Sequence, residues 1–265
     1  MYEEFYGLKE KPFNRTPDPR FLYQSRKHAE ALARLRHAIE EQDIVLLTGE
    51  IGSGKTTLSR AFIDSLDGTF LPLLIINPLL SPAQLLRTVA LRFGMDDRTR
   101  FRHGLLEGIN ARLYELYEAG RRPAIIIDEA QLIPGKATFE ELRLLTNFQL
   151  DDRNLLAIVL IGQTELRGRL NRKAYQALRQ RIGMQYHLGP LDAEETLAYV
   201  EHRLRVAGRT EPLFDGRAQE LLYEHSGGVP RRINIIAGNA LIEGFGRSAE
   251  LIGPEIIQSV VNDGM

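Results

Sequence analysis

An eight-residue segment early in the chain constrains the fold more than any other feature. An apolar run over residues 44–47 precedes it, and a helical pattern over residues 57–63 follows it. A strand that enters a glycine-rich turn and leaves it as a helix directs backbone N–H groups and the positive end of the helix dipole at an anion. We therefore expect an α/β fold with a phosphate-binding loop. The loop reads Gly49-Glu50-Ile51-Gly52-Ser53-Gly54-Lys55-Thr56, which has the spacing G-x-x-x-x-G-K-T.

The side chains of this phosphate-binding loop (residues 49–56) predict a nucleotide and a metal ion as its ligands. The Lys55 ammonium is placed to reach the β- and γ-phosphates, and the Thr56 hydroxyl to ligate Mg²⁺. ATP and Mg²⁺ are therefore the expected substrate and cofactor. The other residues expected to bind the nucleotide here are Gly49, Gly52, Ser53, Gly54 and Thr57.

A second apolar run, residues 124–127, ends in two carboxylates, Asp128 and Glu129. At the carboxyl end of a parallel strand, Asp128 is placed to hold Mg²⁺ through water, and Glu129 to act as the base for an attacking water. The alternative is a buried strand that ends in a solvated acidic turn. Beside a phosphate-binding loop, the pair predicts hydrolysis by a positioned water.

Four further polar positions are candidates for the same site. Gln163 follows the apolar run over residues 156–161, where its amide either contacts the γ-phosphate or orients water, or caps the next helix. Arg179 and Arg181 precede the last expected strand; one is an arginine finger for a neighbouring subunit, or both lie on a solvated basic face. The pattern does not separate these two arginines. Arg231 sits at a helix N-terminus, where the dipole disfavours a cation, so we expect phosphate nearby.

Composition excludes several classes of protein. The 265 residues are 43% hydrophobic and 26% charged, with a net charge of −1, as in ordinary globular proteins. Cysteine is absent, which excludes disulfides, thiolate metal sites and cysteine nucleophiles. The N-terminus does not resemble a signal peptide, and the longest apolar stretch, residues 70–80, is interrupted by two prolines. We expect a cytoplasmic protein without a membrane span.

Three regions are expected along the chain. Residues 1–27 are rich in proline and aromatic residues and predict an extended arm. Residues 28–190 alternate strands and helices and predict a parallel sheet covered on both faces. Residues 191–265 hold only helical patterns and predict a helical lid. The expected strands cover residues 44–48, 70–77, 124–128, 155–161 and 184–188. The expected helices include residues 28–41, 104–118, 138–150, 192–207, 215–226, 230–244 and 254–262, and one that starts at residues 81–82.

These elements, in this order, resemble those of the AAA+ ATPase superfamily. The phosphate-binding loop looks like Walker A, and residues 124–129 look like Walker B. Gln163 looks like sensor 1, Arg179 or Arg181 like the arginine finger, and Arg231 like sensor 2. The resemblance implies a P-loop αβα core with a C-terminal helical lid, ATP hydrolysis and ATP-dependent self-assembly. It also implies that Asn77, at the end of the second strand, restrains Glu129.

A narrower resemblance, to the ExeA/GspA family, covers essentially the whole chain. It rests on residues 5–8 (Phe-Tyr-Gly-Leu), 11–13 (Lys-Pro-Phe), 16–23 (Thr-Pro-Asp-Pro-Arg-Phe-Leu-Tyr) and 227–234 (Gly-Gly-Val-Pro-Arg-Arg-Ile-Asn). That family includes ATPases of general secretion and of MSHA pilus biogenesis. Its secretion members continue into a transmembrane helix and a peptidoglycan-binding domain, whereas this sequence stops at Met265.

Short chains similar to this one also serve transposases, in roles like those of TniB and TnsC. From this resemblance we expect a ring or filament that assembles on duplex DNA with a transposase as partner. The alternative is an assembly ATPase that works through a membrane partner of a secretion or pilus system. In either case Phe13, Pro19 and Tyr23 of the arm are candidates for seating the adenine, or they only pack against the body.

An arginine-rich segment is the candidate contact for DNA. Arg98, Arg100 and Arg102 surround an aromatic residue between the second and third expected strands. Such a segment can follow a phosphate backbone, although two neighbouring aspartates also fit a solvated loop. A second basic cluster follows Gln163 and fits either DNA or a subunit interface. It consists of Arg167, Arg169, Arg172 and Lys173.

A GTPase and a small-molecule kinase are disfavoured. GTPases read their base with an N/T-K-x-D sequence after the fourth strand, and no such sequence stands there. Kinases usually lack a glutamate directly after the Walker B aspartate, where this chain has Glu129. Hydrolysis of ATP is therefore the expected reaction.

Overall fold

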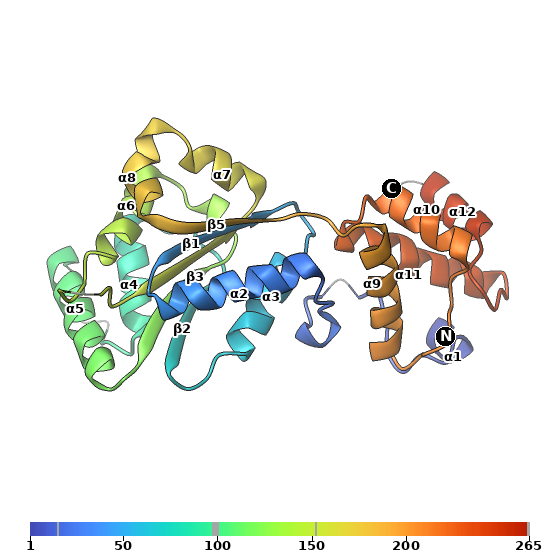
Figure 1. Cartoon of the computed structure of the whole chain (residues 1–265), viewed down its shortest axis with the longest axis horizontal. Coiled ribbons are helices and arrows are strands. Elements are labelled where there is room, and N and C mark those ends of the chain that lie inside the picture. Colours follow the sequence, from blue (N-terminus) through green and yellow to red (C-terminus); the bar gives the residue numbers. More distant parts are fainter. Residues whose placement is uncertain (15, 97–100, 152, 264–265) are drawn as a thin grey trace. The chain divides into compact units, whose positions relative to one another are not determined.

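The computed structural model describes residues 1–14, 16–96, 101–151 and 153–263. They form two compact units (Figure 1). The helical unit consists of Met1–His28, Glu50–Leu58 and Gly189–Met265, and the sheet unit of Ala29–Gly49 and Ser59–Leu188. The boundary passes through the helices α2 (Arg26–Glu40) and α3 (Lys55–Asp64). Residues 50–56 of the phosphate-binding loop are thus grouped with the two ends of the chain.

The sheet unit is built on five parallel strands in the order β2-β3-β4-β1-β5. Parallel register pairs Ile44 with Ile158 and Ile125 with Ile158, so β4 lies between β1 and β3. All residues of β1 and β4 are buried, which explains their unbroken apolar sequences. The expected α/β fold is confirmed. The strands are β1 (Ile44–Gly49), β2 (Phe70–Ile75), β3 (Arg122–Ile127), β4 (Ala157–Gly162) and β5 (Ile182–Leu188).

Two strands tolerate proline because of where it falls in the sheet. Pro72 lies in β2, which is an edge strand. Pro123 pairs with Leu71 of β2, but the pairing of β3 with β4 begins only at Ala124. Neither proline therefore removes a hydrogen bond from the interior of the sheet.

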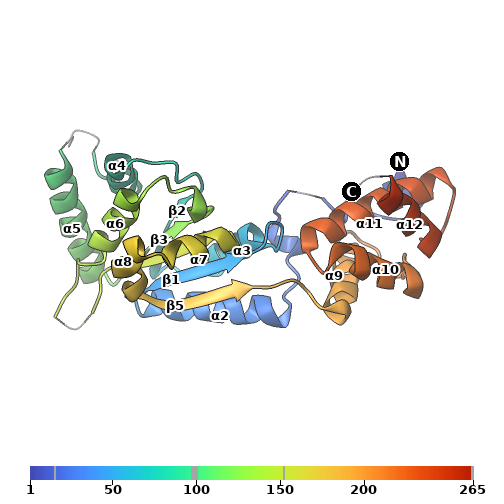
Figure 2. The same ribbon diagram turned by 90° about the horizontal axis from the view of Figure 1, so that it is seen from above.

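Helices cover the sheet on both sides (Figure 2). One side packs against α4, α5 and α6 in a single apolar core. The alternate strand residues, such as Val45 and Leu47, are equally buried. The helices and short 3₁₀ turns of this unit are α4 (Pro82–Arg92), α5 (Arg102–Glu118), η2 (Ala130–Leu132), α6 (Lys136–Leu145), α7 (Thr164–Leu170), η3 (Lys173–Tyr175) and α8 (Gln176–Arg181).

Two elements are shorter than the sequence predicts. The helix expected over residues 138–150 ends at Leu145, where the Thr146 hydroxyl donates to the Arg143 carbonyl at 2.7 Å. An isolated antiparallel bridge between Gln149 and Asn154 then replaces the last expected turn. The second strand ends at Ile75, two residues before Asn77.

The helical unit packs the N-terminal arm against C-terminal helices. The arm is not fully extended, since it contains α1 (Tyr2–Phe5) and the 3₁₀ turn η1 (Pro19–Phe21). Its apolar side chains join one core with those of the C-terminal helices, and the Tyr6 hydroxyl donates to the Ala249 carbonyl at 3.0 Å. Among the described helices, none combines the length and hydropathy needed to cross a bilayer. The C-terminal helices are α9 (Ala193–Val206), α10 (Gly216–Ser226), α11 (Pro230–Gly246) and α12 (Pro254–Asn262).

Candidate nucleotide site

The phosphate-binding loop leaves β1 and ends in the first turn of α3. Gly52 and Gly54 have φ angles of 83° and 93°, in the left-handed region that glycine adopts most readily. Lys55 is 6% exposed, and its Nζ donates to the Glu50 carbonyl at 2.7 Å. These two φ angles give the loop the tight turn expected of a backbone that binds an oxyanion.

Arg231 meets this loop from the N-terminus of α11. Its backbone N–H donates to the Gly52 carbonyl at 3.1 Å. A Cβ atom on Gly52 would lie 2.4 Å from the Cβ of Arg231, so only glycine permits the approach. The structure thus brings Arg231 against the phosphate-binding loop, and its contact with a nucleotide phosphate stays a prediction.

The residues of the loop fit a nucleotide phosphate. The Ser53 hydroxyl is buried and has no hydrogen-bond partner within the described part of the chain. A buried polar atom without a partner is costly, and an incoming phosphate oxygen would satisfy it. Thr56 lies in the first turn of α3, where its hydroxyl is suited to Mg²⁺.

The two carboxylates expected to serve hydrolysis, Asp128 and Glu129, follow β3 in the sheet unit. Asp128 is 3% exposed, and its Oδ1 accepts the Glu129 backbone N–H at 2.9 Å. Glu129 has a φ of 53°, which is uncommon for a residue with a side chain. Such strain is characteristic of functional sites. It turns the chain from β3 into η2 directly at the carboxylate.

Two amides hold the Glu129 side chain. The Gln131 amide nitrogen donates to Glu129 Oε2, and the Gln163 amide nitrogen donates to the same oxygen at 3.4 Å. The Gln163 backbone N–H donates to Gln131 Oε1 at 3.0 Å, which orients the Gln131 amide. Gln163 was a sequence candidate and Gln131 was not, because nothing in its spacing distinguishes it from an ordinary turn residue.

Asn77 does not make the contact that the family resemblance implies. Its side chain is exposed, two residues beyond the end of β2. In the parts of the chain that the structure describes, Asn77 donates no hydrogen bond to Glu129. Gln131 and Gln163 restrain the carboxylate instead.

Arg169 is partly buried and donates hydrogen bonds to neighbouring residues, so it is not an exposed cation. Its Nη1 donates to the Ile133 carbonyl at 2.6 Å and to the Gln131 carbonyl at 3.3 Å. Its Nε donates to the Tyr175 hydroxyl at 3.0 Å, and the guanidinium lies 5.0 Å from the centre of the Phe139 ring. Sequence analysis placed Arg169 in a basic cluster for DNA or a subunit. The structure uses it to hold the turn after β3.

The two finger candidates differ in how firmly they are held. Arg181 donates to the Thr146 carbonyl at 3.3 Å and to Asn147 Oδ1 at 2.8 Å, so it closes the C-terminus of α6. Within the described residues, the exposed Arg179 side chain donates one long hydrogen bond, to the Asn171 carbonyl at 3.5 Å. Arg179 is therefore the side chain that can extend toward another molecule with little loss of existing hydrogen bonds.

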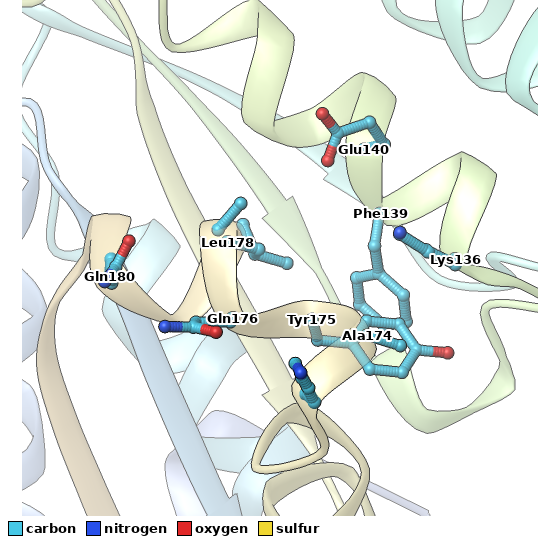
Figure 3. A pocket seen from close by; sticks show the side chains of 10 residues that line it. Lys136, Phe139, Glu140, Ala174, Tyr175, Gln176, Leu178 and Gln180 are labelled. Carbon is cyan, nitrogen blue, oxygen red and sulfur yellow. The ribbon is translucent and has the colours of Figure 1, made fainter.

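A cavity of about 480 Å³ lies beside this segment, between α6 and the η3–α8 turn. Figure 3 shows Phe139 and Tyr175 on one side of it with Lys136 close by. The two rings meet edge to face at 5.5 Å. Leu178 and Gln180, the sequence neighbours of Arg179 in α8, line this cavity.

The DNA candidates receive little structural support. Arg98 and Arg100 lie outside the described residues. Arg102 pairs with Glu141 through two hydrogen bonds, of 2.8 and 3.1 Å. The Glu141 side chain is only 10% exposed, so Arg102 neutralises a carboxylate that would otherwise be costly to bury.

The arm residues considered for adenine pack into the helical unit. Phe13 is buried with its ring 6.1 Å from that of Phe214. The Tyr23 ring lies 6.3 Å from that of Tyr199, and Pro19 begins η1. These contacts are those expected of a packed terminal arm.

Comparison with known proteins identifies the family. Residues 36–170 match the family described as AAA domain. The chain is 42% identical over 255 residues to general secretion pathway protein A of Aeromonas hydrophila. The match covers 95% of this chain and 46% of that protein, so the chain spans about half the length of the curated relative.

Solved structures share the fold across both units. The ORC2 protein of Aeropyrum pernix matches with a TM-score of 0.70 at 21% identity, over 96% of this chain and 71% of that one. Drosophila ORC bound to DNA matches with a TM-score of 0.70 at 19% identity, over 97% and 65%. The RuvB branch migration motor of Thermotoga maritima matches with a TM-score of 0.61 at 20% identity, over 90% and 68%.

Proposed function

The chain belongs to the AAA domain family, as an AAA+ ATPase of the general secretion pathway protein A type, and from this premise we propose that it hydrolyses ATP at a site completed by a second copy of itself. The observation that carries the proposal is that the Gln131 and Gln163 amides both donate hydrogen bonds to the Glu129 carboxylate. A carboxylate fixed by two amide donors is placed to orient and deprotonate one water molecule.

Phosphate binding and activation of the attacking water are carried out by different residues. Backbone N–H groups of the phosphate-binding loop and the Lys55 ammonium would bind the β- and γ-phosphates. Both amides contact Oε2 of Glu129, and among the described residues none donates to Oε1, which is left to accept a proton from the attacking water. The proton moves to Glu129 as the water oxygen attacks the γ-phosphorus, and ADP leaves.

Two residues of this chain suit the metal ion. The Thr56 hydroxyl and the Asp128 carboxylate would hold Mg²⁺, directly and through water. When bound, the ion would neutralise charge that develops on the phosphate oxygens. The hydrogen bond from the Glu129 N–H fixes Asp128 Oδ1 and so orients that carboxylate.

The second copy would supply Arg179. Its exposure and single weak contact leave the guanidinium available, whereas Arg181 is committed to α6. A planar guanidinium that donates to two phosphate oxygens stabilises transition-state charge. ATP binding would then favour assembly, and hydrolysis would release it.

The setting that fits best is an assembly ATPase of a secretion or pilus system, which acts through a membrane partner. The identity to general secretion pathway protein A supports this setting. Deletion of the gene should block secretion or pilus formation, and a copy with Glu129→Gln should not restore it. Normal secretion and piliation after deletion would refute this role.

A second candidate is an ATPase that assembles on duplex DNA for a transposase. It is favoured by exposed cations on the α7–α8 segment, namely Arg167, Arg172, Lys173 and Arg179. Electron microscopy with a non-hydrolysable ATP analogue, with and without duplex DNA, tests both settings. Filaments or rings that need DNA, together with hydrolysis stimulated by DNA at low salt, would favour this candidate. Assembly that is the same with and without duplex DNA would favour the secretion setting.

A further inference from the structure

His28 is a buried histidine that the mechanism above leaves unused. It lies in the first turn of α2 and is 3% exposed. The Ser25 hydroxyl lies 2.8 Å from its ring Nδ1 and accepts the His28 backbone N–H at 3.3 Å. The Ser25 hydroxyl can donate its own proton to Nδ1, and in that arrangement the ring proton is on Nε2.

The Nε2 side of the ring faces the phosphate-binding loop. The Ser53 backbone lies close enough to the ring to raise the pKa of His28, as a carbonyl that accepts from Nε2–H does. His28 Nε2 also lies 3.2 Å from the position that a Cβ would take on Gly54. Glycine at this position therefore admits the histidine ring as well as allowing the φ of 93°.

The same turn of α2 is tied to the start of α9. The Arg26 backbone N–H donates to Glu195 Oε1 at 3.1 Å, and Lys27 Nζ donates to the Pro190 carbonyl at 2.5 Å. Glu195 is 7% exposed, and its Oε2 accepts the Asp192 N–H at 3.3 Å in a capping box. Three consecutive residues thus join the phosphate-binding loop to the cap of a C-terminal helix within the helical unit.

We propose that His28 is a positioning residue, which holds the phosphate-binding loop in the backbone conformation that binds nucleotide. This inference rests on the proposed function. Ordering a loop around phosphate costs conformational entropy, and a loop already held by a neighbour has less to lose. His28 acts on the Ser53 and Gly54 backbone and does not touch the phosphate.

Substitution separates this role from plain packing. His28→Ala removes the donor, whereas the amide N–H of His28→Gln can take the place of Nε2–H. His202→Ala is the matched control, because His202 is a partly buried histidine of the same unit that packs beside Tyr23. Binding of a fluorescent ATP analogue, together with kcat and KM for ATP, is measured for each variant that circular dichroism shows to be folded.

We expect His28→Ala to weaken nucleotide affinity and raise KM about tenfold, while kcat at saturation falls less than about threefold. His28→Gln should recover most of the affinity, and His202→Ala should leave it unchanged. If His28→Ala fails to fold, Ser25→Ala tests the same point, because the ring then loses its orienting hydroxyl. Its affinity should fall in the same direction by a smaller factor.

Two results would overturn the inference. One is a folded His28→Ala protein, or a folded Ser25→Ala protein if it replaces it, with wild-type affinity and KM. The other is equal loss of affinity in His28→Ala, His28→Gln and His202→Ala, which would indicate general destabilisation. Wild-type protein that neither binds nor hydrolyses ATP would instead refute the proposed function, so the two failures are distinguishable.

Discussion

Arg169 donates to the carbonyl oxygen of Ile133 at 2.6 Å and thereby joins α7 to the turn that follows Glu129. The same guanidinium reaches the Gln131 carbonyl and the Tyr175 hydroxyl. Gln131 holds Glu129, and Tyr175 directly precedes α8, which carries Arg179. One side chain therefore fixes both the turn after β3 and the segment that carries the proposed arginine finger.

Replacement of Arg169 should destabilise the protein. Arg169→Ala leaves two carbonyls without their donor and removes the contacts with the Phe139 and Tyr175 rings. We expect the free energy of unfolding, measured with urea, to fall by about 2 kcal/mol. Arg167→Ala, an exposed neighbour on the same helix, should change it by less than about 0.5 kcal/mol. Equal effects of the two substitutions would contradict this role for Arg169.

Glu129→Gln should separate binding from hydrolysis. The amide keeps the size of the side chain but cannot accept the proton of the attacking water. Turnover of ATP should fall at least about 100-fold while affinity for ATP changes little. Phosphate release and binding of a fluorescent ATP analogue measure the two effects. Turnover near the wild-type rate would show that Glu129 is not the base.

Gln131→Ala should lower kcat with little effect on KM. Without its amide donor, the Glu129 carboxylate keeps only the longer contact from Gln163 and samples more orientations. A loss of about tenfold in kcat is expected for a misoriented base. Asn77→Ala is the control, and it should leave kcat unchanged because Asn77 does not restrain Glu129. A larger effect from Asn77→Ala than from Gln131→Ala would reverse this assignment.

Arg179 should act on a neighbouring copy. Arg179→Ala and Lys55→Ala should each be nearly inactive, the first for lack of a finger and the second for lack of bound nucleotide. A mixture of the two can form sites with an intact loop and an intact finger, so ATP hydrolysis should partly return. No return at any mixing ratio would argue for a role within one chain. Arg181→Ala should mainly lower stability, since Arg181 closes the C-terminus of α6.

The histidine beneath the phosphate-binding loop should make stability depend on pH. Burial lowers the pKa of His28, while the Ser53 backbone and Glu195 oppose the shift and Lys27 adds to it. Below the unfolded-state pKa of about 6.5, the unfolded chain binds more protons than the folded one, so stability falls as pH falls. His28→Gln cannot take up this proton.

Urea unfolding of both proteins at about pH 7.5 and at about pH 5 measures this effect. The wild type should lose more stability than His28→Gln over the interval. The His202 contribution is common to both proteins and cancels in the difference. An identical loss in the two proteins would show that His28 does not contribute.

Most of the fold and the two central motifs were predictable because they are encoded locally. Unbroken apolar runs predict buried parallel strands, and the glycines of residues 49–56 predict a turn that no other residue adopts as readily. Asp128 and Glu129 follow one such strand directly. Boundaries were less predictable, as at Leu145, where a threonine hydroxyl ends a helix that its sequence pattern would extend.

Sequence patterns were sufficient to predict an α/β fold of the AAA+ type, and they predicted the phosphate-binding loop and the pair Asp128 and Glu129. The side chains that support these residues became visible only in the folded structure. Gln131 and not Asn77 restrains Glu129. Arg102 forms an ion pair with Glu141, and Arg169 donates hydrogen bonds to the turn after β3. Residues adjacent in sequence determine the local path of the backbone. The residues of these supporting pairs, however, are two to 39 positions apart in the chain, and packing of separate elements brings most of them together.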